Sequence, residues 1–229
     1  MLKKTRGIVI NYIKFRETSI IVKIFTRDLG LKSYIVNGVR SSKTSSKISF
    51  FQPMSLLDLV VYDKEGASLN RISEVKLAHA FRLIPFDFYR SGVAMFMTEV
   101  LGKSLYDHDS NEGLFDDLWD NILELDAPDV KLGIFPLAFL VSTSQQLGFG
   151  VDNADEFFLQ VYEDPKGSPY ALSTKNALDE LLRSRFQSVS GLSKTERNQL
   201  LDDMLRFYQM HLDRFGEIKS LGILRSMMY

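Results

Sequence analysis

Lysine and arginine side chains crowd the start of this sequence, and the chemistry available to them is the binding of phosphate. Residues 1–52 hold eleven Lys and Arg against two acids, a balance of +9, whereas the rest of the chain carries a balance of −10. Cationic side chains neutralise phosphates and release counterions, so such asymmetry indicates an anionic partner for the basic end. The alternative is a solvated surface that keeps the protein soluble.

These cations fall on a predicted β-hairpin and its flanks. Residues 19–26 and 31–36 are β-rich runs separated by a turn that contains a glycine, which is a hairpin signal. Residues 41–47 contain no apolar side chain and therefore have nothing to bury. We expect a DNA-binding surface made of the following cations: Arg6, Lys14, Arg16, Lys23, Lys32, Arg40, Lys43 and Lys47. Changing Arg40 and Lys43 to Ala should weaken binding equally for all sequences and lower its salt dependence.

Two aromatic residues on this hairpin are candidates for stacking on bases. Side chains along residues 23–26 and 32–35 should alternate between the barrel core and the surface. If Ile24 and Ile35 point inward, Phe25 and Tyr34 face outward beside lysines, a composition typical of single-strand binding. The opposite register buries both rings, and the sequence leaves the register open. Phe25 and Tyr34 are therefore included among the candidate DNA-binding residues.

The sequence gives little support to catalysis. His79, His108 and His211 lie far apart, without metal-ligand spacing, and there is no phosphate-binding glycine loop. The absence of cysteine excludes thiol catalysis, disulfides and Cys-ligated metal sites. The pairs Asp116-Asp117 and Asp202-Asp203 point about 100° apart on a helix, so we interpret them as solvated rather than as dyads. We expect no enzyme activity, no cofactor and no metal.

The first 80 residues predict a small antiparallel barrel. Strands are expected at residues 8–13, 19–26, 31–36, 55–62 and 68–77, the last two joined by Asp63-Lys64-Glu65-Gly66. Five short strands in this length are typical of an OB-fold, whose strand 2–3 face and loops bind oligonucleotides.

Residues 81–229 predict a mostly helical domain, which makes the chain α+β. Helical periodicity covers residues 86–105, 112–125, 130–147, 174–184 and 194–215, and a last helix is expected over residues 219–229. Pro136 should bend the third of these, and Gly148 suits its C-terminal stop. Residues 157–162 and 170–172 are expected to form a short inserted hairpin.

A second binding function is possible in the helical half. Arg183, Arg206 and Arg214 accompany apolar helix faces and could hold a short acidic and hydrophobic peptide. The competing functional class is thus a protein-interaction module, with the barrel as its docking surface. No apolar run is long enough for a membrane span and the N-terminus lacks a signal-peptide pattern, so we expect a cytoplasmic protein without a membrane partner.

The N-terminal residues resemble the bacterial recombination mediator family RecO. The resemblance rests on a G-x-V-L start, an E-[ST]-S-x-[IL] step, an [FL]-T-x-x-x-G turn and a K-G-[AV]-R-x-x-[KR] ending. These stand here as Gly7-Ile8-Val9-Ile10, Glu17-Thr18-Ser19-Ile20-Ile21, Phe25-Thr26 with Gly30, and Asn37-Gly38-Val39-Arg40-Ser41-Ser42-Lys43. Later similarities are Phe51-Gln52-Pro53, Leu147-Gly148-Phe149-Gly150-Val151-Asp152 and Lys219-Ser220-Leu221.

This resemblance implies an OB-fold followed by a helical domain. It implies binding of single- and double-stranded DNA, annealing of complementary strands, and loading of RecA at gaps together with RecR and the C-terminal tail of single-strand-binding protein, in a nucleoid-associated role. Two features depart from the family. Asn37 replaces the usual Lys, and residues 151–172 lack the four cysteines of the zinc site that many members carry.

Overall fold

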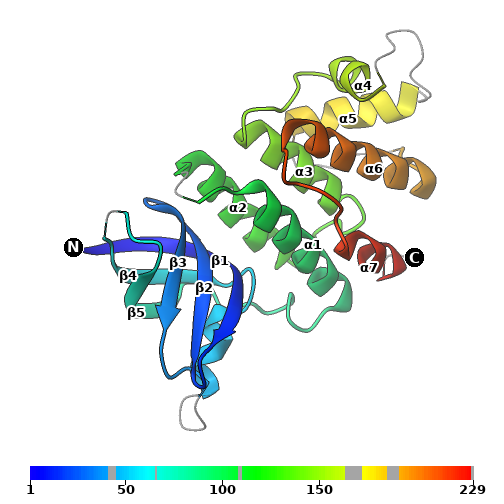
Figure 1. The fold of residues 1–229 in the computed structure, drawn as a ribbon. Helices are drawn as coiled ribbons and strands as arrows, with labels where there is room; N and C mark the ends of the chain where they lie inside the picture. Colours follow the sequence, from blue (N-terminus) through cyan, green and yellow to red (C-terminus); the bar gives the residue numbers. More distant parts are fainter. Residues whose placement is uncertain (41–44, 65, 108–109, 163–171, 185–190, 228–229) are drawn as a thin grey trace.

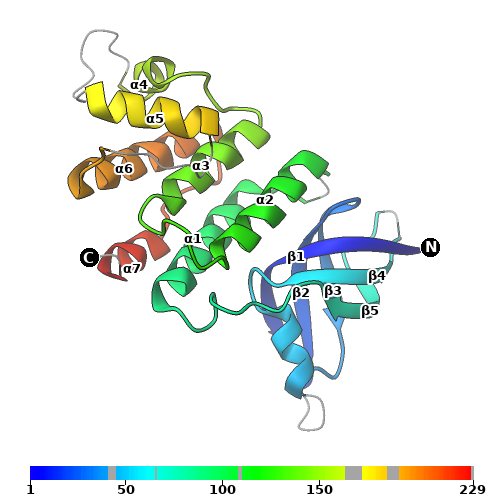
Figure 2. The same ribbon diagram turned by 180° about the vertical axis from the view of Figure 1, so that it is seen from behind.

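The computed structural model describes residues 1–229 except 41–44, 65, 108–109, 163–171, 185–190 and 228–229. An N-terminal β-barrel is followed by a helical domain, and the two lie side by side (Figures 1 and 2). None of the helices in the described ranges is both long and apolar enough to cross a membrane.

Five strands close into a barrel in the order β1-β2-β3-β5-β4, as the sequence predicts for an OB-fold. Their bounds are β1 (Leu2–Phe15), β2 (Ser19–Thr26), β3 (Gly30–Val36), β4 (Leu56–Tyr62) and β5 (Asn70–Leu77), with a 3-10 helix η1 (Ser45–Phe51) between β3 and β4. All neighbouring strands are antiparallel except β3 and β5, which pair in parallel. The inside of the barrel is filled by apolar side chains such as Val22, Ile24 and Leu57.

The described residues after the barrel form seven α-helices. They are α1 (Phe88–Ser104), α2 (Glu112–Leu125), α3 (Phe135–Gln146), α4 (Ala154–Tyr162), α5 (Leu172–Ser184), α6 (Lys194–His211) and α7 (Ser220–Met227). Side-chain caps start several of them: Asn111 Oδ1 accepts from Leu114 N, and Ser193 forms a capping box with Glu196. Gly148, with φ of 85°, follows the end of α3 and confirms the predicted stop.

Two predictions for the helical half are wrong. Residues 157–162, expected to be one arm of a hairpin, belong to α4, which buries Phe157, Phe158 and Val161 on one face. Of the other arm, residues 170 and 171 lie outside the described residues and Leu172 begins α5. Pro136 bends nothing, because α3 begins at Phe135 and proline is tolerated in the first turn.

One hydrophobic cluster joins the outer face of the barrel to the helices, beside the separate cluster inside the barrel. Ile8, Phe25 and Leu31 on the outer face of the barrel pack into the same cluster as helix residues such as Phe96 and Phe115. The Phe25 and Phe115 rings lie 5.8 Å apart between centroids. Strand β2 is therefore buried on both faces around Phe25, by the barrel interior on one side and by the helical domain on the other, whereas Ile21 and Lys23 on its outer face are only partly buried.

Candidate nucleic-acid interface

The pairing of β2 with β3 decides where the hairpin cations point. Lys23 lies opposite Ser33, whereas Lys32 lies opposite Ile24, whose side chain fills the barrel interior. Adjacent residues of a strand face opposite sides, so Lys23 points outward and Lys32 lies on the inner face. The side chain of Lys32 is only 13% exposed and pairs with Asp63, which also binds Lys3 at 2.7 Å. Hydrogen bonds from these two lysines lower the pKa of Asp63. Lys32 thus closes one end of the barrel and does not belong to its outer surface.

The structure corrects the prediction that Phe25 and Tyr34 stack on bases. Both side chains are fully buried. Phe25 faces outward from β2 but is covered by the helical domain, and Tyr34 points into the barrel, where burial raises the pKa of its hydroxyl. Neither ring is accessible to a base.

Several barrel cations hold the helical domain in place. Lys23 pairs with Asp107 at 3.1 Å. Arg27, on the turn between β2 and β3, contacts both Asp116 and Glu112 of α2. These contacts use positive charge within the molecule, and Lys23, predicted to bind DNA, is one of the cations used in this way.

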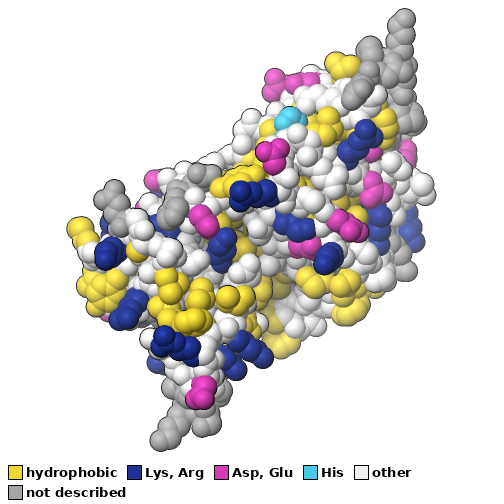
Figure 3. Space-filling view, in the orientation of Figure 1, with side chains coloured by type: hydrophobic (Ala, Val, Ile, Leu, Met, Phe, Trp, Pro, Cys, Tyr) yellow, Lys and Arg dark blue, Asp and Glu magenta, His cyan; other side chains and the backbone are white. Residues whose placement is uncertain are grey.

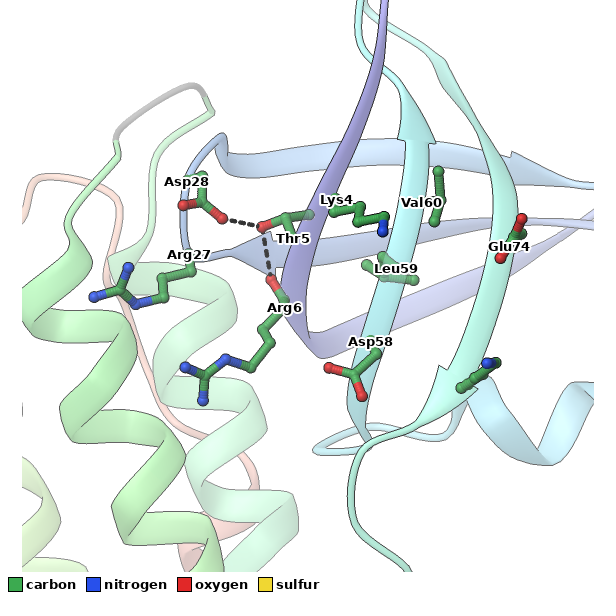
Figure 4. Close-up of a pocket in the computed structure, with 10 residues that line it drawn as sticks. Lys4, Thr5, Arg6, Arg27, Asp28, Asp58, Leu59, Val60 and Glu74 are labelled. Carbon is green, nitrogen blue, oxygen red and sulfur yellow. Dashed lines mark hydrogen bonds between the residues drawn. The ribbon is translucent and has the colours of Figure 1, made fainter.

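A groove of about 510 Å³ crosses the outer face of β1, β4 and β5 (Figure 4). Its cations are balanced across the strands: Arg6 lies opposite Asp58, which lies opposite Lys76. Arg6 also rests over the Trp119 ring, with its guanidinium carbon 5.2 Å from the ring centroid. Acids and bases alternate along this groove, so it offers no uniform attraction to a polyanion.

A different end of the barrel gathers cations that form no described ion pair, although the exposed Glu17 lies in the turn between β1 and β2. The Asn37-Gly38 turn, with φ of 70° at Gly38, directs Val39 into the barrel core. Arg40 then lies against the turn between β1 and β2: its backbone N–H donates to Thr18 O at 3.0 Å, and its Nη1 donates to Arg16 O at 3.2 Å. Hydrogen bonds of Arg40 thus hold the loop after β3 against the turn between β1 and β2.

Lys14 and Lys47 complete this surface. Lys14 is exposed near the end of β1, Arg16 is exposed at the turn, and Lys47 is exposed on η1, which packs against β1. Within the described residues, none of Lys14, Arg16, Arg40 and Lys47 forms an ion pair with an acid. We call these four residues the basic end. Lys43, from the same predicted set, lies outside the described residues. Figure 3 shows Lys and Arg side chains gathered at the lower end of the barrel.

The arginines predicted to bind a peptide are spread over the helical domain. Arg183 is exposed near the end of α5, Arg206 is exposed on α6 with its guanidinium carbon 6.0 Å from the Tyr162 ring centroid, and Arg214 is exposed beyond α6. None of the three lines a described groove.

The interpretation of the adjacent aspartate pairs as solvated is wrong for one member of each pair. Asp117 and Asp203 are buried, and accept hydrogen bonds from Ser142 and Tyr162 respectively. Their neighbours make ion pairs: Asp116 with Arg27, and Asp202 with Arg225 at 2.7 Å. All four carboxylates thus have partners within the protein. In the described part of the chain, no three His, Asp or Glu residues gather as a metal site would require.

Exposed aromatic residues occur where the sequence analysis did not place them. Phe86, Phe88 and Tyr89, at the start of α1, are 84%, 65% and 46% exposed. In sequence they look like part of an amphipathic helix, and only the position of the barrel shows that no described element covers them. In the sequence, the feature that could have pointed to this exposed group is the presence of three aromatic residues within four positions.

Comparison with known proteins gives a single family. The family model described as Recombination protein O N terminal matches residues 1–81, and Recombination protein O C terminal matches residues 85–221. Proteins named DNA repair protein RecO are similar over nearly their whole length. That of Flavobacterium johnsoniae is 38% identical and that of Flavobacterium psychrophilum 35%, each over 97% of both chains. That of Bacteroides fragilis is 31% identical over 99% of both chains.

Proposed function

Because the chain belongs to the recombination protein O (RecO) family of DNA repair proteins, we propose that it binds single- and double-stranded DNA at the basic end of its barrel, anneals complementary strands and helps to load RecA at gaps. A role in repair and recombination follows from the family. The DNA contact and the annealing step are our proposal for this chain.

The observation that carries the proposal is the convergence of unneutralised cations at one end of the barrel. Lys14, Arg16, Arg40 and Lys47 come from three separate segments, and none has a described acidic partner. Cations placed this way displace counterions from phosphates, which gives affinity without sequence preference and with strong salt dependence. Since these phosphate contacts read no base edges, they suit any strand.

Annealing would need no catalytic residue. Two complementary strands repel each other through their phosphates, and a cationic surface that binds both lowers this repulsion. The proposal therefore assigns no reaction and no cofactor to the chain, and it places the protein with DNA at the nucleoid. RecR and the C-terminal tail of single-strand-binding protein are the protein partners that we propose on the basis of the family.

A second function, docking of a protein on the barrel, is favoured by one feature of the outer face. Ile13, Ile21 and Ile35 lie opposite one another across β1, β2 and β3. Ile13 is 61% exposed and Ile21 and Ile35 are partly exposed, and such an apolar row suits a protein partner better than a phosphate backbone.

The two proposed functions predict different affinities of the protein for DNA. Fluorescence anisotropy of a labelled mixed-sequence single strand, titrated at several salt concentrations, should give micromolar or tighter binding that weakens steeply with salt. An annealing assay would follow. If no strand binds at low salt, the DNA-binding proposal fails and the protein-docking function becomes the better account.

A further inference from the structure

A cavity of about 650 Å³ lies between the barrel, the segment that leads out of it, and α1. Its walls come from Gln52 and Pro53 after η1, from Leu77 at the end of β5, from Phe81 and Ile84 in the connecting segment, and from Met95 on α1. We call it the junction pocket. Its size and its mainly apolar walls with a few polar groups are typical of a ligand site between two domains.

The junction pocket is held open by a buried carboxylate. Asp126 accepts hydrogen bonds from the backbone N–H groups of Arg82, Leu83 and Ile84, each at 2.9 Å. It also contacts His79 Nε2 at 3.2 Å. Burial works to raise the pKa of Asp126, but these hydrogen bonds outweigh it and lower the pKa. The connecting segment is thereby fixed in one shape, and a ligand would find the pocket already formed.

Aromatic rings line and border the junction pocket. Phe81 forms part of its wall, with its ring centroid 5.4 Å from that of His79. Pro85, another wall residue, leads directly to the exposed rings of Phe86 and Phe88. Flat aromatic surfaces beside a cavity are suited to stacking on flat ligands.

Positive charge borders the junction pocket. Arg82 is exposed and directly follows the wall residue Phe81 in sequence. Helix η1 connects the pocket to the basic end, since it bears Lys47 of the basic end and the pocket residue Ser49. A DNA strand bound at the basic end would thus meet a further cation, Arg82, at the junction pocket.

We propose that the junction pocket receives an unpaired base of a DNA strand whose phosphates lie on the basic end. This inference rests on the proposed DNA-binding function. A base fits these walls because it has two apolar faces for Phe81 and Met95 and a polar edge for groups such as Gln52 and His79. A protein partner docked there would need acidic side chains to suit Arg82 at the rim, whereas a DNA strand carries that negative charge on its phosphates.

One consequence concerns the choice between single and double strands. A base inside a duplex is stacked and paired, so both of its faces and its pairing edge are occupied. The phosphate contacts of the basic end are available to either form, whereas the junction pocket serves only the single strand. The pocket should therefore add affinity for single strands alone.

The test compares two labelled strands of equal charge in anisotropy titrations with the full chain. One is a mixed-sequence strand of about 20 nucleotides, and the other has the same length but carries a central run of abasic residues. This length exceeds the number of nucleotides that a single OB-fold barrel usually binds. Wild type should bind the base-bearing strand about tenfold more tightly than the abasic one. If it binds both equally, the inference is overturned while DNA binding stands, and the pocket is left to a protein. If it binds neither, the proposed function fails as well.

Variants of the junction pocket test whether the base binds there. Ala80→Leu fills the pocket from an exposed wall position, and the double variant Phe86→Ala/Phe88→Ala removes two exposed rings, so neither should impair folding. Each should reduce the tenfold difference to about twofold and leave affinity for the abasic strand unchanged. Tyr62→Ala removes a 51% exposed ring on β4 and should keep the full difference. A tenfold difference that survives in both junction variants would overturn the placement.

Discussion

The guanidinium of Arg27 meets the carboxylate of Asp116 in a forked pair of hydrogen bonds, Nε to Oδ1 at 2.8 Å and Nη2 to Oδ2 at 2.9 Å. Arg27 sits on the turn between β2 and β3, and Asp116 on α2, so this pair joins the barrel to the helical domain. The hydrogen bond from Arg27 lowers the pKa of Asp116. Part of the positive charge of the barrel therefore pairs with negative charge of the helical domain within the molecule.

This geometry predicts coupling between the two residues. Arg27→Gln and Asp116→Asn should each lower the melting temperature, and the double variant should lower it by no more than the larger single effect, because the bidentate pair is lost only once. Thermal unfolding of the four proteins forms a double-mutant cycle. Additive effects would show that the pair contributes nothing to docking.

Phe25 should contribute to the free energy of unfolding and not to the affinity for DNA. Phe25→Ala removes a fully buried ring that contacts the Phe115 ring across the domain boundary, which should cost about 3–5 kcal/mol of unfolding free energy. Urea denaturation should still show one transition, since one hydrophobic cluster spans the boundary between the barrel and the helices. DNA affinity at a temperature where the variant is folded should equal that of wild type. A loss of affinity there would restore Phe25 as a DNA contact.

The orientation of the hairpin residues could not be read from the sequence alone. Alternation leaves the register open: Ile24 lies inside the barrel, whereas Ile35 lies opposite Ile21 on the outer face. The strands themselves are found close to their predicted positions. What alternation cannot show is that the outer face of β2 is covered, because the covering residue, Phe115, is 90 positions away. The sequence also gives no sign that Lys32 faces inward, since its partner Asp63 lies beyond two further elements.

Gly7 should not tolerate a side chain. A Cβ at this position would lie 2.6 Å from Ile24 Cγ2 and 2.7 Å from Leu59 Cδ1, both in the packed barrel interior. Gly7→Ala should therefore lower the free energy of unfolding by about 1–3 kcal/mol. The matched control is Gly102→Ala on α1, where the nearest heavy atom would be 3.8 Å away. Equal stability of the two variants in urea would contradict the packing account.

Glu99 should make stability depend on pH. Its carboxylate accepts from the backbone N–H groups of Lys219 at 2.9 Å and Ser220 at 2.8 Å, at the start of α7. Burial works to raise its pKa, but hydrogen bonds from Ser220, Lys219 and Lys103 outweigh this and lower it to about 2. Because the folded pKa lies below the ordinary value of 4.5, the carboxylate stabilises the protein above pH 4.5, and this stability is lost as the pH falls toward 2.

The variant Glu99→Gln separates this effect from general acid unfolding. At neutral pH it should lower the free energy of unfolding by about 1–2 kcal/mol, through loss of charged hydrogen bonds to the start of α7. Below pH 4.5 the difference from wild type should shrink, as urea denaturation at a series of pH values would show. A difference that stays constant over that range would mean that the carboxylate does not titrate with folding.

In the helical domain, short elements were the hardest to predict. The nine residues of α4 carry two adjacent phenylalanines, which favour a strand on propensity. Its helical start is fixed by Asn153, whose Oδ1 accepts from Glu156 N at 2.9 Å. Longer periodic runs such as α2 were predicted at their observed bounds, because several turns of amphipathic pattern outweigh single residues.

The most direct test of the DNA-binding account is the salt dependence of single-strand affinity in the triple variant Lys14→Gln/Arg16→Gln/Lys47→Gln. These side chains are exposed and make no described ion pair, so folding should be preserved. Anisotropy titrations should show affinity reduced for every sequence, and a plot of log K against log salt whose slope is smaller in magnitude by about 2 than that of wild type. The control, Arg183→Gln/Arg206→Gln/Arg214→Gln, removes three exposed cations from the helical domain and should leave the slope unchanged. Equal slopes in wild type and the basic-end variant would contradict the account.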